Sequence, residues 1–123
     1  MKTPIRHPQE IEVWYILPAI RKEIVVALKE KGKAQKEIAK LLNITEAAVS
    51  QYTKEKRAMG ISFPQELKEY IRETIAEIKD SASAFHQIQK ISEHIKHSKL
   101  LCLLHAQIEG ELKNCEACYK KQN

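Results

Sequence analysis

All three cysteines of the chain and one of its five histidines stand in a short stretch near the C-terminus, CLLHAQIEGELKNCEAC. Their spacing is Cys-x2-His-x9-Cys-x2-Cys, formed by Cys102, His105, Cys115 and Cys118. Three thiolates and one imidazole suit tetrahedral zinc, and thiolates with an occasional histidine also hold iron–sulfur clusters. The spacing therefore predicts a metal or iron–sulfur site.

Two other interpretations of these side chains stay open. Cys102 lies in the apolar run LLCLLHA, which is typical of an ordinary buried thiol. Cys115 and Cys118 form a Cys-x-x-Cys pair, which without metal can act as a reversible dithiol switch. The odd number of cysteines argues against a disulfide framework.

A second group of polar residues lies in QKEIAKLLNITEAAVSQYTKEKR, residues 35–57. The pattern predicts a helix over 35–42, a turn at Asn43 and a second helix over 46–54. Asn tolerates the left-handed backbone of such a turn, and Thr45 can cap the second helix by accepting a backbone N–H. This arrangement is typical of a DNA-binding helix-turn-helix, whose second helix enters the major groove. A plain helical hairpin is the alternative.

Positions along this segment divide into an inward and an outward set. The side chains expected to face the core are Ile38, Ala39, Leu42, Val49 and Tyr52. Those expected to contact a duplex are Gln35, Thr45, Glu46, Ala47, Ser50, Gln51, Lys54, Lys56 and Arg57. Gln35 and the N-terminus of its helix suit a phosphate, and the three basic residues lie where a duplex backbone would pass. Gln51 can bond adenine, Glu46 can accept from cytosine, and Ala47 can pack on a thymine methyl.

The same residues carry a resemblance to known proteins. The segment resembles the helix-turn-helix of the Cro and phage-repressor type, Gln-x-x-Ile-Ala-x-x-Leu-x-Ile-Thr-x-x-x-Val-Ser-x-Tyr. The stretches KTP, VWYILPAIRKEI and TEAAVSQYTKEKRA are similar to predicted archaeal transcriptional regulators with a cysteine-bearing C-terminus. The resemblance implies a regulator whose cysteines bind an iron–sulfur cluster or zinc. The chain departs from the usual pattern at Asn43, where Gly is common, and at Ala34, where Ser or Thr would cap the helix.

The positive charge of the chain is concentrated in its first half. The net charge is +5 at pH 7; residues 1–60 contain 12 Lys and Arg against 7 Asp and Glu, whereas residues 61–123 contain 9 of each. Such a distribution is expected where one part of a protein meets a polyanion. We therefore expect a DNA-binding domain over 1–60 and a region for dimerisation and sensing over 61–123.

Apolar positions recur at intervals of three and four almost throughout, which predicts an all-helical chain. Pro18 is expected in the first turn of a helix that ends at Gly32, because proline there costs no hydrogen bond. Trp14 and Tyr15, just before it, are expected in the core. A short last helix is expected to end at Gly110.

Two stripes of apolar residues lie beyond residue 63. The first contains Leu67, Ile71, Ile75 and Ile78, and the second contains Phe85, Ile88, Ile91 and Ile95. One recognition helix alone contacts too few base pairs for genomic specificity. We therefore expect a homodimer with at least one stripe in its interface; the alternative is that both stripes complete the core of one chain.

Several classes of protein are disfavoured by the sequence. No run approaches the about 20 apolar residues that a membrane span needs, and the N-terminus lacks the apolar centre of a secretory signal, which favours a cytoplasmic protein. No paired carboxylates, activated nucleophile or phosphate loop indicates an enzyme. Three hypotheses remain: a homodimeric regulator sensing redox state or iron, a regulator with structural zinc or no metal, and a protein-interaction module of the antitoxin type.

Overall fold

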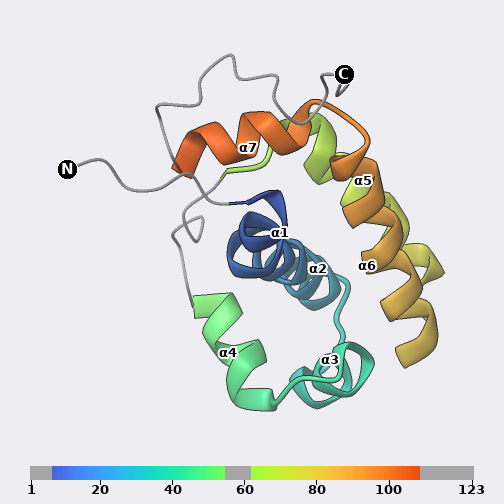
Figure 1. Ribbon diagram of the computed structural model, residues 1–123. Helices are drawn as coiled ribbons and strands as arrows, with labels where there is room; N and C mark the ends of the chain where they lie inside the picture. The colour runs from blue at the N-terminus through green and yellow to red at the C-terminus, as the bar shows by residue number, and fades with distance from the viewer. Residues whose placement is uncertain (1–6, 55–61, 109–123) are drawn as a thin grey trace, which may run out of the picture.

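The computed structural model describes residues 7–54 and 62–108, and within these two ranges it is all-helical, without a strand (Figure 1). The first range contains α1 (Pro8–Ile11), the π-helical turn η1 (Glu12–Ile16), α2 (Leu17–Glu30), α3 (Gln35–Leu42) and α4 (Glu46–Lys54). The second contains α5 (Gln65–Thr74), the 3-10 turn η2 (Ile75–Glu77), α6 (Ser81–Lys96) and α7 (Leu100–Ile108). None of these helices combines the length and the apolar character of a bilayer-spanning segment.

The N-terminal helical segment begins earlier than the sequence predicts. Pro18 lies in the first turn of α2, as predicted, but α1, η1 and α2 follow one another without a break, so the helical segment extends further toward the N-terminus. Inside an α-helix, proline removes one hydrogen bond and its ring collides with the carbonyl group four residues earlier. The π-helical turn directly before Pro18 is the change of register that lets the helix continue.

This change of register also overturns one expectation about the core. Trp14 is 57% exposed, so its predicted place in the core is wrong. Tyr15 is half-buried and packs against the core, and Ile16 is buried. Glu12, one turn earlier, forms an ion pair with Lys96 near the end of α6, with 3.7 Å between Oε2 and Nζ.

One hydrophobic core joins the two described ranges, with α2 at its centre (Figure 1). Ile20 and Ile24 of α2 are fully buried, as is Ile71 of α5. All of these side chains belong to the same cluster of buried residues. Residues on both sides of position 60 therefore share one core, and the boundary between the two expected domains lies outside the described residues.

The two apolar stripes contribute mainly to this core. The first stripe is buried within the single chain along its whole length, which contradicts its use as a dimer interface. In the second stripe Ile91 and Ile95 are buried and Ile88 is partly buried, but Phe85 is 69% exposed. Of the stripe side chains, only Phe85 thus remains largely accessible to another molecule.

Polar contacts fix α6 against the earlier helices. Asp80 caps α6 by accepting from the backbone N–H of Ser83 at 2.8 Å, while the Ser83 hydroxyl group accepts from the Asp80 N–H at 2.9 Å. Hydrogen bonding from the Ser83 backbone N–H, and from its side chain, holds the pKa of the Asp80 carboxyl group below its usual range. The Ser81 hydroxyl group donates to the Lys40 carbonyl oxygen at 2.9 Å, so α6 begins against the end of α3.

Hydrogen bonds between residues far apart in the sequence hold α5 and α7 against the rest of the chain. Arg72 of α5 donates to both carboxylate oxygens of Glu30 at the end of α2, at 2.8 and 3.4 Å, which lowers the pKa of Glu30. Gln107 of α7 accepts from the Ser62 backbone N–H at 2.6 Å and donates to the Ser62 carbonyl oxygen at 2.9 Å. The chain that enters α5 is therefore held against α7.

Candidate nucleic-acid interface

The first helix of the predicted pair, α3, begins and ends at the predicted residues, Gln35 and Leu42. Its inward face contains Ile38, Ala39 and Leu42, all buried in the shared core. The small Ala39 side chain suits the close approach of two crossing helices. At its N-terminus Ala34 has the extended backbone of an N-cap, with φ −72° and ψ 150°, but makes no side-chain cap. The weak cap predicted from the sequence is confirmed.

Ala34→Ser is expected to stabilise the folded chain by about 1 kcal/mol, because its hydroxyl group can accept from the backbone N–H of Lys36 or Glu37 at the start of α3. Glu37 stands three residues later and can complete a capping box. Urea unfolding followed by circular dichroism measures the change. Ala47→Ser is the control, since it adds the same hydroxyl group to an exposed position inside α4. A midpoint for Ala34→Ser at or below that of the wild type would contradict the expectation.

The turn between α3 and α4 adopts the predicted conformation. Asn43 has the left-handed values φ 56° and ψ 45°. The Asn43 N–H donates to the Lys40 carbonyl oxygen at 3.3 Å, and the Ile44 N–H donates to the Ala39 carbonyl oxygen at 3.0 Å. These are the bonds that close a helix through a left-handed residue. The short polar side chain of asparagine explains why no glycine is needed here.

α4 begins with the predicted cap. The Thr45 Oγ1 atom accepts a hydrogen bond at 3.0 Å from the backbone N–H of Ala48, which lies three residues later in the sequence. Val49 is fully buried and Tyr52 packs partly buried against the core, as expected for the inward face of this helix. The turn, the cap and the buried face together fix the direction in which α4 points.

One contact between the two helices is absent from the sequence-based prediction. The Gln35 Nε2 atom donates to the Glu46 carbonyl oxygen at 2.8 Å, which ties the first residue of α3 to the first residue of α4. The side-chain amide group keeps a second N–H and its oxygen for other partners. Gln35 therefore orients α4, and its expected phosphate contact remains a prediction.

The outward face of α4 brings four of the predicted residues together. Ala47, Ser50, Gln51 and Lys54 line one shallow depression with a volume of about 350 Å³. They recur at intervals of three and four, so they form a single stripe on the helix. Thr45 and Glu46 are exposed at the start of α4. Lys56 and Arg57 lie outside the described residues.

Basic side chains are distributed around this pair of helices. Lys36 and Lys40 on α3 and Lys54 on α4 are exposed. Lys33 is partly neutralised by Glu37, with 3.3 Å between Nζ and Oε2, but an exposed pair of this kind contributes little to stability and opens easily. The surface can offer polar donors, one apolar methyl group and several cations to a polyanion.

The predicted metal site is only half described. Cys102 and His105 both lie on α7, where Cys102 is half-buried and His105 is 5% exposed. Cys115 and Cys118 lie outside the described residues. Within 7–54 and 62–108 no three potential ligands gather closely enough to hold an ion. The metal site therefore stays a prediction.

Comparison with known proteins finds no matching family model, no matching curated protein and no matching solved structure.

Proposed function

We propose that this protein is a sequence-specific DNA-binding transcriptional regulator of the helix-turn-helix type. One observation carries the proposal: the stripe of Ala47, Ser50, Gln51 and Lys54 on the outward face of a short helix whose first turn is held by hydrogen bonds from Gln35 and to Thr45. A protruding α-helix fits the major groove of B-DNA, where glutamine can bond adenine and a lysine can reach a phosphate. The concentration of positive charge in residues 1–60 supports the same proposal.

The geometry of the turn gives each neighbouring residue a role in this proposal. Gln51 and Ala47 contact base edges, with Glu46 and Ser50 beside them. The hydroxyl group of Thr45 and the second amide N–H of Gln35 donate to phosphates, because the hydrogen bond that Thr45 accepts and the one that Gln35 donates within the protein leave these two donors available. Lys54, with Lys56 and Arg57 beyond it, follows the duplex backbone.

Binding to duplex DNA should be specific and should weaken steeply with salt. Each phosphate that a lysine or arginine neutralises contributes about −0.9 to the slope of log K against log salt. Titration of genomic fragments and random duplex at several salt concentrations, followed by fluorescence anisotropy, measures both properties. If no genomic fragment binds more tightly than random duplex at any salt concentration, the regulator is excluded and an interaction module of the antitoxin type becomes the better account.

We also propose that the regulator is a homodimer, because two recognition helices are needed to distinguish an operator from the rest of a genome. The buried first stripe cannot supply the interface, so contacts from the exposed surface of the chain must do so. Light scattering at micromolar concentration gives the mass directly, for comparison with 14.2 kDa for one chain.

We further propose that Cys102 and His105, together with Cys115 and Cys118, bind an iron–sulfur cluster or zinc. The i, i+3 spacing places Cys102 and His105 on neighbouring positions of α7, which suits two ligands of one ion. Thiolates must be deprotonated to bind, so a metal would connect α7 to the cysteines beyond it.

Anaerobic preparation followed by iron, sulfide and zinc analysis should find about one centre per chain, and each Cys→Ser variant should lose metal. The brown colour of an iron–sulfur cluster distinguishes it from colourless zinc. Ser98→Ala, at a polar position before α7, serves as the control that should retain the metal. Folded wild-type protein with less than about a tenth of an equivalent of any metal would contradict the site, since a four-ligand zinc or cluster site binds tightly.

A further inference from the structure

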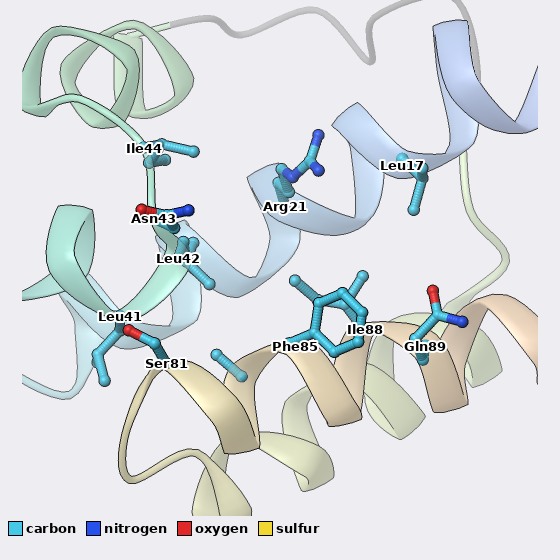
Figure 2. A pocket seen from close by; sticks show the side chains of 11 residues that line it. Leu17, Arg21, Leu41, Leu42, Asn43, Ile44, Ser81, Phe85, Ile88 and Gln89 are labelled. Carbon is cyan, nitrogen blue, oxygen red and sulfur yellow. The ribbon is translucent and has the colours of Figure 1, made fainter.

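A groove lies on the face of the protein where α2, α6 and the turn between α3 and α4 meet (Figure 2). Its volume is about 590 Å³, within the range of about 300–1,000 Å³ that is typical of small-molecule sites. Leu17 and Arg21 line it from α2, Asn43 and Ile44 line it from the turn, and Phe85 and Ile88 line it from α6. No residue that we assign to the duplex or to a metal lies in this groove.

The walls of the groove are mainly apolar. Figure 2 shows Phe85 and Ile88 on α6 opposite Leu17 on α2. Leu17 and Ile88 are partly buried against the core, whereas the Phe85 ring is 69% exposed at the edge of the groove. The exposed ring extends the apolar wall of the groove and offers a surface that a bound molecule can cover.

The charge on the α2 side of the groove identifies the kind of molecule. Arg21 is half-buried, and among the residues that the structure describes it has no hydrogen bond or ion pair. Acidic side chains of the neighbouring elements bind other partners and do not neutralise Arg21. Glu12 pairs with Lys96 and Glu30 pairs with Arg72. Asp80 caps α6. Glu23, on the same helix as Arg21, acts electrostatically on Arg72. The groove therefore combines an apolar wall with an uncompensated guanidinium group.

We propose that this groove binds a small amphipathic monocarboxylate, with its carboxylate group on Arg21 and its hydrocarbon chain against Leu17, Phe85 and Ile88. A guanidinium group binds a carboxylate through two parallel hydrogen bonds, and this geometry selects it over an uncharged head group. The hydrocarbon chain gains free energy by leaving water and by covering the exposed ring.

The position of the groove gives the ligand a route to the proposed function. Asn43 and Ile44 belong to the turn that sets the direction of α4, and they line the same groove, so a bound molecule lies beside this turn. An effect of the bound ligand on duplex binding rests on the proposed DNA-binding function. Occupancy of the groove does not depend on it, and the experiment below contains no DNA, so the two proposals can fail separately.

Octanoate and 1-octanol are suitable probes because they differ mainly in the charge of the head group. Isothermal titration of the purified chain should show octanoate binding at least about tenfold more tightly than 1-octanol, the ratio expected for a hydrogen bond to a charged group. Arg21→Gln should abolish this preference. Lys29→Gln, which removes an exposed cation from α2 outside the groove, should leave the preference unchanged.

The apolar wall is tested with a second pair of variants. Phe85→Ser should weaken both probes, whereas Leu103→Ser, at a 50% exposed position on α7, should weaken neither. Equal affinity of the wild type for the two probes, no binding of octanoate, or an unchanged preference in Arg21→Gln would overturn the proposal. It would also be overturned by light scattering that shows a dimer which Phe85→Ser dissociates and Leu103→Ser does not, because a second copy would then occupy the groove.

Discussion

Ile71→Ala is expected to lower the free energy of unfolding by about 2–5 kcal/mol, the cost of leaving a cavity in a packed core. Ile71 is fully buried on α5, in the same cluster as Ile20 and Ile24 of α2. The missing atoms cannot be replaced by water, because the surrounding side chains are apolar. The loss should be a large fraction of the total stability of a chain of this size.

This variant also measures how far the two halves of the chain unfold together. Trp14 is the single tryptophan and lies in the first half, whereas Ile71 lies in the second. If one core holds both, Ile71→Ala must shift the transition seen by Trp14 fluorescence as much as the transition seen by circular dichroism. Leu103→Ala, at an exposed position, should change stability by less than about 0.5 kcal/mol. A Trp14 transition that stays at the wild-type midpoint would show that residues 1–60 unfold independently.

Gln51→Ala is expected to relax base preference at one position of the operator and to cost about 1–3 kcal/mol there, because alanine cannot replace a bidentate contact to a base. Lys54→Ala is the matched variant, since both residues line the same depression on α4. It should weaken binding to all sequences about equally and reduce the salt slope by about 0.9. Selection from randomised duplexes, with affinity measured at two salt concentrations, separates the two effects.

The two variants rest on the proposed regulator, and their outcomes can contradict it in different ways. An unchanged operator preference for Gln51→Ala would remove Gln51 from the residues that contact bases. An unchanged salt slope for Lys54→Ala would place the duplex backbone elsewhere on the surface. Lys56→Ala is expected to behave like Lys54→Ala, because Lys56 follows Lys54 by two positions in the sequence.

The sequence predicted the bounds of α3 and α4 correctly because their signals are local. A left-handed asparagine and a capping threonine are separated by one residue, and each acts on backbone groups within a few positions. The bond between Gln35 and Glu46 was missed because it depends on the angle between two helices, which periodicity does not determine. The same limit applies to the two stripes, since helical spacing predicts an apolar face without indicating what covers it.

Local sequence patterns also could not predict the lining of the groove or the helical segment that precedes Pro18. Arg21 and Phe85 lie far apart in the sequence and line one groove because α6 packs against α2 and α3 in the folded chain. Pro18 lies in the first turn of α2, as its local signal predicts, but that signal does not indicate the π-helical turn that continues the helical segment toward the N-terminus. The predicted ligand set of the metal site stays untested because two of its four residues lie outside the described ranges.

That π-helical turn has a consequence for how the N-terminal segment can change. A π turn holds one residue more than an α turn, so it acts as a single-residue insertion that shifts helical phase by about 100°. Deleting one residue from Glu12–Ile16 would restore α-helical phase but rotate α1 relative to α2, and would move Glu12 away from Lys96. Substitutions on the exposed side of this turn, where Val13 and Trp14 lie, leave the phase unchanged. The segment should therefore accept changes of side chain far more readily than changes of length.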